Sequence, residues 1–576
     1  MAQYSMNAYD ADVYIPEFKG LMQYGDQMNG DLRFSPDCMN VETPAGVLQP
    51  AAKLKNVLLR TDDTHVLGAV ENFTVIYLRA KNYLALPYTI KKFVATDDLG
   101  RSATAPAYQV DVEEEFESYL VVAGTKLYSF SLPVDLSVYQ QQLPFEIQKD
   151  MITEVWLTQE SGTYANKRWS FCTYETTYNI ALPGEDPHYV TANVVIMSNE
   201  TNGVYSWDGT TINKINSVPT TFGHVARFAE RIWGVGIGDN KDRLYYSAVY
   251  NAFDWNPNAT EYADGGGEIR EATFDNDRLV ALMPFGDALI AFSEQRAWRI
   301  SGSDPSNFNI QEQYGNGTRY PESIAVIGDQ LIMLGEHGLV VYDGYRVTPF
   351  MQEATYEIFR DAQLSKTGIG TPVAIAINNK YVLALANKLY NGSGTFENTG
   401  YRFLIYDRMD STLTITDCPA ITSFCAEPPY AWAAVANENE GSYEANVTML
   451  RFDSWDLRDV SGAATKWMTP WVTLGRKDIQ KGGFDLYFYP ELAEDATEGV
   501  TFTFSIQTEK KTKTKSYTVQ PLTAKQKEAG KKYKQKRLHF GGAGRRFRLT
   551  IETAAGVTTP WRLIGGIHII AEIDKD

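Results

Sequence analysis

Apolar residues along this chain fall in short runs of roughly four to eight residues, and the runs end at Gly, Asn, Asp or Pro. Runs such as Val194–Met197 are apolar throughout, which is typical of strands that are buried on both faces. Runs such as Val500–Gln507 alternate strictly between apolar and polar residues, which is typical of strands with one face in solvent. Helical periodicity is confined to two short candidates, residues 352–364 and 523–536. The pattern predicts an all-β fold.

A repeated unit occupies the middle of the chain. In each copy an apolar run, a polar turn and a second run ending in an aromatic residue follow one another, and six such aromatic anchors are Tyr205, Tyr245, Trp298, Tyr342, Tyr406 and Phe452. Their spacings are 40, 53, 44, 64 and 46 residues, and a four-stranded propeller blade takes about 40–50 residues. The longest interval contains an insertion, Asn387–Gly400, rich in Asn, Gly, Ser and Thr. We expect a β-propeller of roughly six to eight blades over residues 51–465, with a large β-sandwich of similar hairpins as the alternative.

The two ends of the chain differ from this repeat. The C-terminal part holds at least four alternating or apolar runs, namely Phe484–Tyr489, Val500–Gln507, Phe547–Glu552 and Ile567–Ile573. These runs predict a small β-sandwich over residues 466–576. Residues 1–50 are rich in Tyr and Met, and we expect an extended segment that packs on neighbouring subunits.

Length and composition narrow the class of protein. The 576 residues are 44% hydrophobic and 22% charged, which excludes an intrinsically disordered chain. One hydrophobic core stops growing at roughly 250–300 residues, so we expect more than one domain. The N-terminal stretch lacks the basic and apolar regions of a signal peptide, and no apolar run reaches the roughly 18 residues of a membrane-spanning helix. We therefore expect synthesis in a cytoplasm and no membrane insertion.

Charge is distributed unevenly along the chain. The net charge of −18 argues against a dedicated nucleic-acid binder. Residues 508–548, however, hold 14 Lys and Arg and 2 Asp and Glu, a net charge of +12 that leaves −30 for the rest. This segment is either a solvated Lys-rich hairpin or helix, or a basic arm that docks on acidic neighbours or on a phosphate backbone. Its candidate contacts with a partner or with DNA are Lys510, Lys511, Lys513, Lys515, Lys531, Lys532, Lys534, Lys536, Arg537, Arg545, Arg546 and Arg548.

Motifs of common active sites are missing from the sequence. The six histidines form neither an HxH nor an HExxH pattern, and neither a GxSxG elbow nor a P-loop occurs. The four cysteines, Cys38, Cys172, Cys418 and Cys425, include no CxxC pair and suit thiols in a reducing compartment, with a Cys418–Cys425 bridge left open. We expect no catalytic residues, no cofactor and no metal, and hence no enzyme.

Two stretches of the chain carry motifs that resemble a known family. The first reads Phe18-Lys19-Gly20-Leu21-Met22-Gln23, then Ser35-Pro36-Asp37-Cys38-Met39-Asn40-Val41, then Gly46-Val47-Leu48. It is similar to the opening of many bacteriophage virion proteins, in which a GLN segment is followed by SPDALNV and a GGL-type turn. Met22 and Cys38 replace the usual Asn and Ala. The second stretch contains Arg231-Ile232-Trp233, Arg243-Leu244-Tyr245-Tyr246-Ser247 and Phe253-Asp254-Trp255, and it is similar to a propeller blade of the same proteins.

These relatives are β-propeller proteins of the phage tail, including the hub or nozzle of short-tailed phages. The resemblance covers residues 18–48 and 194–350. It implies a structural virion protein that forms a homo-oligomeric ring, a hexamer in that family, on the head-proximal tail. Such a ring completes the DNA ejection channel and retains packaged DNA. The implied partners are the portal or adaptor, other tail proteins and, transiently, the genomic DNA, and the implied location is the virion tail after synthesis in the host cytoplasm.

Two other functions are consistent with the sequence. The first is a β-propeller protein that binds or degrades glycans, with the C-terminal sandwich as a carbohydrate-binding module and Trp467, Trp471 and Trp561 as aromatic platforms. The second is a DNA-anchoring protein that uses residues 508–548, for which DNA binding would depend steeply on salt.

Overall fold

The structure is a computed structural model, and the residues that it describes are 6–7, 10–23, 30–62, 64–67, 70, 72–79, 88–90, 93–96, 102–104, 108–110, 115–134, 136, 147–179, 189–257, 264–270, 277–315, 317–360, 364, 371–390, 396–427, 430–436, 447–451, 460–473 and 481–573.

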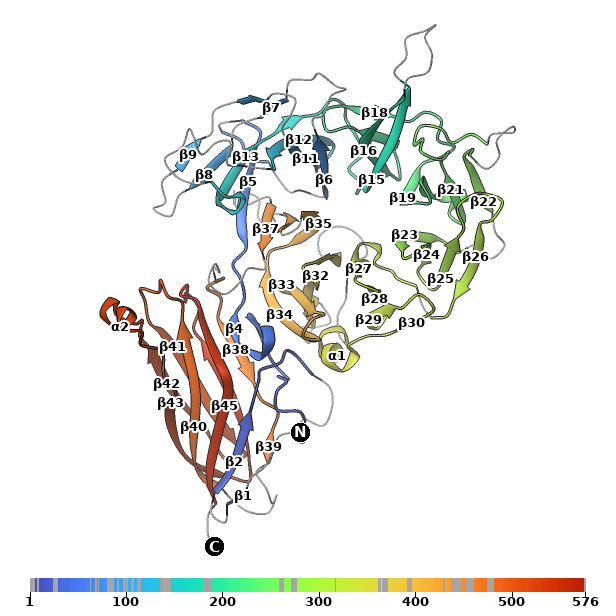
Figure 1. Cartoon of the computed structure of the whole chain (residues 1–576). Coiled ribbons are helices and arrows are strands. Elements are labelled where there is room, and N and C mark those ends of the chain that lie inside the picture. Colours follow the sequence, from blue (N-terminus) through green and yellow to red (C-terminus); the bar gives the residue numbers. More distant parts are fainter. Residues whose placement is uncertain are drawn as a thin grey trace.

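Seven sheets in this described part of the chain stand around a ring and form a β-propeller (Figure 1). Six of them are antiparallel and four-stranded. The first two consist of β6 (Asn72–Arg79), β11 (Glu115–Ala123), β12 (Lys126–Pro133) and β14 (Thr158–Gln159), and of β15 (Ser170–Asn179), β16 (Tyr189–Asn199), β17 (Gly203–Trp207) and β18 (Ile212–Lys214). The next two consist of β19 (Phe222–Phe228), β20 (Arg231–Gly236), β21 (Arg243–Tyr246) and β22 (Gly267–Arg270), and of β23 (Leu279–Phe285), β24 (Ala288–Ser293), β25 (Ala297–Ser301) and β26 (Asn309–Gln313). The fifth and sixth consist of β27 (Ala325–Ile327), β28 (Gln330–Gly335), β29 (Gly338–Tyr342) and β30 (Val347–Pro349), and of β31 (Val373–Ile377), β32 (Lys380–Tyr390), β33 (Phe396–Asp407) and β34 (Thr412–Cys418).

The seventh sheet closes the ring with strands from both ends of the propeller. It contains β35 (Ile421–Glu427), β36 (Tyr430–Val435), β37 (Val447–Arg451) and β5 (Lys55–Arg60), and it continues through β13 (Ile152–Trp156), β8 (Phe93–Thr96) and β9 (Ser102–Thr104). β37 pairs with β5, so that Val447 lies opposite Val57. Because the last blade includes an early strand, the ring cannot open without breaking this ladder. The predicted propeller, with a blade number inside the expected range, is confirmed.

The aromatic repeat of the sequence marks one position in consecutive blades. Its members lie in β17, β21, β25, β29 and β33, which are the third strands of five successive sheets. Trp298 and Tyr342 are fully buried between blades. The sixth anchor, Phe452, lies outside the described residues. The apolar runs form the second strands, and every residue of β24 is buried, as the pattern of the sequence predicts.

The C-terminal part is the predicted β-sandwich (Figure 1). One sheet has the order β1 (Met6–Asn7), β2 (Asp10–Ile15), β45 (Trp561–Ile573), β40 (Lys481–Leu492) and β43 (Lys536–Gly544). The other has the order β38 (Thr465–Met468), β44 (Arg546–Thr553), β41 (Val500–Thr508) and β42 (Thr512–Val519), with β39 (Val472–Thr473) also paired to β44. Phe488 packs on Phe504 with ring centroids 4.5 Å apart, and Phe484 packs on Phe547 at 5.1 Å. The alternating runs thus meet in one core.

The remaining elements are short. They are the strand pairs β7 (Tyr88–Ile90) with β10 (Tyr108–Val110) and β3 (Val41–Glu42) with β4 (Gln49–Pro50), the 3₁₀ turns Pro44–Gly46, Lys149–Met151, Gly238–Asn240 and Pro321–Ser323, and the helices α1 (Gln352–Arg360) and α2 (Ala524–Glu528). The helix predicted over 523–536 is therefore too long. It stops because Gly530 adopts a left-handed φ of 63° and the chain turns towards β43. No helix in the described part of the chain has the length and apolar character needed to cross a bilayer.

The N-terminal segment ties the two domains together. β2 pairs with β45 of the same chain, so that Asp12 lies opposite Ile570. Further on, the Leu21 N–H donates to the Leu413 carbonyl of the sixth blade at 2.6 Å. The expected contact of this segment with neighbouring subunits stays a prediction.

Candidate functional site

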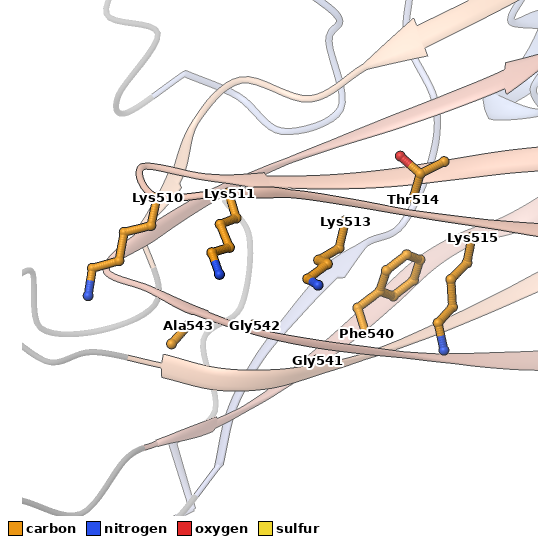
Figure 2. A pocket seen from close by; sticks show the side chains of 9 residues that line it. All are labelled: Lys510, Lys511, Lys513, Thr514, Lys515, Phe540, Gly541, Gly542 and Ala543. Carbon is orange, nitrogen blue, oxygen red and sulfur yellow. The ribbon is translucent and has the colours of Figure 1, made fainter.

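A groove lies between two strands at the open side of the sandwich (Figure 2). β42 and β43 are the last strands of the two opposing sheets, and they lie beside each other without backbone pairing. The groove encloses about 570 Å³. It is lined on one side by Lys510, Lys511, Lys513, Thr514 and Lys515 and on the other by Phe540, Gly541, Gly542 and Ala543. The groove is therefore a strongly cationic hollow at the edge of the sandwich.

The register of β41 and β42 explains why the lysines point into the groove. Directly opposed residues of an antiparallel pair share one face of the sheet. Lys515 lies opposite Phe504 and Lys513 opposite Ile506, and both apolar partners are buried in the core. The two lysines thus occupy core-facing positions, but at the open edge of the sheet their side chains stay exposed.

The other face of the same pair carries hydroxyl groups. Thr501 and Thr518 are joined Oγ1 to Oγ1 at 2.8 Å, and further such contacts join Thr503 to Ser516 and Ser505 to Thr514. Thr514 accordingly points away from the groove in Figure 2, whereas the lysines reach towards β43. The strict alternation of the sequence thus sorts cations to one face and hydroxyls to the other.

Cation–π contacts take the place of backbone hydrogen bonds between the two edge strands. The Lys515 Nζ lies 6.0 Å from the centroid of the Phe540 ring, and the Lys536 Nζ lies 5.7 Å from that of Tyr517. In the first contact the lysine belongs to β42 and the ring to β43, and in the second the lysine belongs to β43 and the ring to β42. Each is worth about 0.5–1 kcal/mol at an exposed site, so they align the strands without closing the groove.

Glycines keep the second wall of the groove low. The register of β40 and β43 shifts between Gly482 and Phe484, opposite Gly541 and Gly542, which is a β-bulge. A Cβ atom added at Gly541 would meet no other atom within 4 Å. The backbone of β43 is therefore accessible to a ligand at this point.

The arginines of the basic segment already have partners inside the fold. Arg537 donates to Asp485 at 2.6 Å, Arg546 donates to Glu509 at 3.2 Å, and the guanidinium of Arg548 lies 4.8 Å from the ring of Trp471. The hydrogen bond from Arg537 lowers the pKa of Asp485 below its usual value. These three arginines thus make their contacts inside the sandwich domain.

The lysines of the groove are in a different situation. Lys511, Lys513 and Lys515 are exposed, and within the described residues none of the three forms an ion pair with a carboxylate. The turn before β42 is fixed by Thr508, whose N–H donates to the Lys511 carbonyl at 2.8 Å. Their positions are set by the backbone, and their charges remain available to a ligand.

The structure thus divides the twelve cations predicted from the sequence. Lys510, Lys511, Lys513 and Lys515 come together in the groove. Lys531, Lys532 and Lys534 lie exposed in the loop between α2 and β43, and Lys536, Arg537, Arg545, Arg546 and Arg548 lie in β43, the following turn and β44. Sequence reasoning missed the wall formed by Phe540–Ala543. The sequence signal for this wall is the glycine-rich run Gly541-Gly542-Ala543-Gly544, which follows the alternating lysines of 511–515 in the same basic segment.

The first resembling motif, Ser35–Val41, lies between the propeller and the sandwich. Asn40 is 3% exposed, and its side chain donates to Asp417 of the sixth blade at 2.8 Å and to the Ala464 carbonyl at 2.9 Å. The fully buried Ser35 accepts a hydrogen bond from the Met468 N–H of β38 at 3.1 Å. The motif is a polar clamp that fixes one domain on the other.

The second resembling motif holds a propeller blade together. Arg231 is 0% exposed, and its Nη1 donates to the carbonyls of Ser247 at 2.7 Å and Gly265 at 2.6 Å. Desolvation by burial lowers the pKa of this guanidinium. The Ser247 hydroxyl in turn accepts from the Ile232 N–H at 3.0 Å. The motif ties the strand β20 to the loop outside β21.

Other candidate sites from the sequence have structural roles in the fold. Trp467 and Trp561 are buried in the sandwich core, and the half-buried Trp471 lies next to the guanidinium of Arg548. Trp467 and Trp561 therefore present no open aromatic face for a sugar, and the Arg548 guanidinium lies over one face of Trp471. The four cysteines are free thiols, and burial raises the pKa of Cys38 to about 12. No group of His, Cys, Asp and Glu in the described part of the chain has the geometry to hold a metal ion.

The fold and the groove define an all-β propeller protein with a C-terminal β-sandwich and a lysine-lined edge. No protein-family model matches the chain, and no curated protein matches it. Among solved structures, it is similar to a mutant of the GH43 protein BlXynB from Bacillus licheniformis, with a TM-score of 0.21, 9% identity and coverage of 60% of this chain and 97% of that chain. It is also similar to a Cry1Da tryptic core variant from Bacillus thuringiensis, with a TM-score of 0.15, 11% identity and coverage of 54% and 53%. Neither likeness bears on what the chain does.

Proposed function

We propose that this protein is a non-enzymatic structural subunit of a bacteriophage tail. In this proposal it is a hub or nozzle protein that assembles into a ring around the channel for DNA ejection. The observation that carries the proposal is the place of the resembling motifs in the fold. Ser35–Val41 clamps the propeller to the sandwich, and the Arg231 motif locks a propeller blade. The residues behind the resemblance therefore build the rigid two-part body that the wall of a conduit needs.

The charge of the chain supports the same role. Outside residues 508–548 the net charge is −30. Proteins bind DNA mainly by neutralising its phosphates with Lys and Arg. A channel wall with a negative charge, like that of DNA, therefore lets the duplex pass without adhering to it. Rigid sheets with many exposed loops also offer the complementary surfaces of a ring that closes.

The proposal is tested on particles whose genome encodes this chain. Mass spectrometry of purified virions should find the chain in the tail fraction, and mass photometry of tails or of the purified protein should find multiples of the chain mass. The virion measurement decides, because ring assembly in the proposal takes place on a portal or adaptor. A chain that is absent from virions and stays monomeric contradicts the proposal.

A further inference from the structure

The lysines of the groove form a regular row of cations. Lys513 and Lys515 occupy alternate positions at the start of β42, and Lys511 directly precedes the strand. Alternate residues of a strand lie about 6.7 Å apart. Phosphates on one strand of duplex DNA advance about 3.4 Å along the helix axis at each step and wind around it. A straight row of three lysines, about 13 Å long, is therefore long enough to face more than one phosphate. The row is complementary to the backbone of a nucleic acid in charge and comparable with it in length.

The lining of the groove does not suit a protein partner. Cores of protein interfaces are enriched in Tyr, Trp, Met and Arg and depleted in Lys. Here the walls are lysines and glycines, and the one aromatic, Phe540, is 1% exposed. No apolar anchor is therefore available in the groove to dock on another chain.

A lipid surface does not suit the groove either. Proteins that bind membranes through cations also insert apolar side chains into the interface. Most of the large hydrophobic residues that are exposed in the described chain, such as Tyr314, Tyr345 and Met409, belong to the propeller. Tyr14 of β2 and Tyr489 of β40 are exposed on the sandwich, but neither lines the groove. The groove is a concave site that presents positive charge without an exposed apolar side chain to insert into a membrane.

The covered aromatics favour a duplex over a single strand. Proteins that bind single strands stack the bases on exposed aromatic rings. Phe540 is buried, and Tyr517 is half-buried beside the Lys536 ammonium. Lysines that contact phosphates without reading bases bind any sequence.

We propose that the groove between β42 and β43 binds the sugar–phosphate backbone of duplex DNA through Lys511, Lys513 and Lys515, without sequence preference. At Gly541 the low wall lets the backbone of the nucleic acid approach β43. The acidic remainder of the chain does not prevent this, because charges more than about 8 Å away are largely screened at physiological salt. The inference deepens the proposed conduit role by giving it one point of DNA contact.

The test is a titration of a labelled DNA duplex with the full-length chain at several salt concentrations. The groove variant is K511Q/K513Q/K515Q. The matched control is K126Q/K167Q/K214Q, which removes the same charge from exposed lysines of the propeller. Each neutralised phosphate contributes about −0.9 to the slope of log affinity against log salt. We expect the slope to become shallower by about 2.7 in the groove variant and to stay unchanged in the control. Between about 50 and about 200 mM salt, the wild-type chain should then lose about 40-fold more affinity than the groove variant.

A second pair of variants tests the groove from its other wall. G541E places a carboxylate among the lysines at a position with room for a side chain, and G541A is its control. We expect G541E to weaken duplex binding about tenfold, because the added carboxylate attracts the lysines and repels the phosphates. G541A, which adds no charge, should leave binding unchanged.

Several results overturn the inference. They are no duplex binding by the wild-type chain at about 50 mM salt, an equal loss in groove variant and control, and tighter binding of single-stranded DNA. Tighter binding of polyglutamate, or of phosphatidylcholine vesicles with phosphatidylglycerol, overturns it too and points to an acidic protein or a lipid. The titration needs no ring, so failure here is distinguishable from a chain that never enters virions.

Discussion

Arg231 in the propeller and Lys513 in the sandwich carry the same charge in opposite surroundings. Arg231 is fully buried and gives its hydrogen bonds to two backbone carbonyls. Lys513 is exposed on an edge strand, and no carboxylate in the described chain pairs with it. The comparison shows that burial and hydrogen-bond partners, rather than charge, distinguish a cation that stabilises the fold from a cation that is available to a ligand.

The largest expected effect is on the propeller side of this comparison. R231M leaves the carbonyls of Ser247 and Gly265 buried without their donor. The free energy of unfolding should fall by about 3–5 kcal/mol, as when one partner of a buried charged interaction is removed. Denaturant unfolding followed by tryptophan fluorescence measures it. R270M in the same blade is the control, because Arg270 is exposed and its ion pair with Glu268 is worth less than about 1 kcal/mol. Equal losses in the two variants would break the comparison.

A smaller effect is expected at the clamp between the domains. N40A removes the hydrogen bonds to Asp417 and Ala464, which should cost about 1–3 kcal/mol in a buried site. Asn40 also has a left-handed φ of 56°, which Gly tolerates and Ala does not. N40G should therefore lose less stability than N40A. Limited proteolysis between propeller and sandwich reports the loosened clamp, and unchanged cleavage in both variants would contradict this role of Asn40.

The ion pair of the sandwich should have a modest and pH-dependent effect. The pKa of Asp485 is lowered by the hydrogen bond from Arg537. A folded-state pKa below the unfolded value of about 3.9 gives stability that is present above that value and lost as the pH falls through the folded pKa. D485N should thus cost less than about 1 kcal/mol at neutral pH, with a difference from wild type that shrinks on acidification. His539 Nδ1 also lies 3.0 Å from Asp485 Oδ1, so the decisive range is below about pH 4, where the carboxyl itself takes up a proton. A difference that grows in that range would contradict the assignment.

The smallest effect on stability is expected in the groove itself. K511Q/K513Q/K515Q should change the free energy of unfolding by no more than about 0.5 kcal/mol, because the three lysine side chains are exposed. A slight gain is consistent with relief of repulsion between like charges. A loss above about 2 kcal/mol would place these lysines with Arg231 among the residues that build the fold.

Local pattern was sufficient to predict most of the architecture. The spacing of Tyr205, Tyr245, Trp298, Tyr342 and Tyr406 reports the third strand of successive blades, because each blade repeats the same packing. Closure of the ring was out of reach, since Val57 pairs with Val447 and no local pattern links strands so far apart. The helix over 523–536 was predicted too long because its charged residues resemble a helix surface, while Gly530 ends it early.

The candidate site was only half visible in the sequence. The excess of Lys and Arg identified residues 508–548, but not which cations have partners. Arg537 meets Asp485 across 52 positions of the chain, a contact that composition does not reveal. The second wall, Phe540–Ala543, is contributed by the opposing sheet. A groove between two sheets exists only once both sheets are in place.

The central claim is that this chain forms the wall of a DNA conduit, and an image of the particle tests it most directly. A three-dimensional reconstruction of tails from particles that encode the chain should show copies of the propeller–sandwich body in a closed ring around an axial channel. A tail that has no density for this body, or that carries it as single copies away from the channel, would contradict the account.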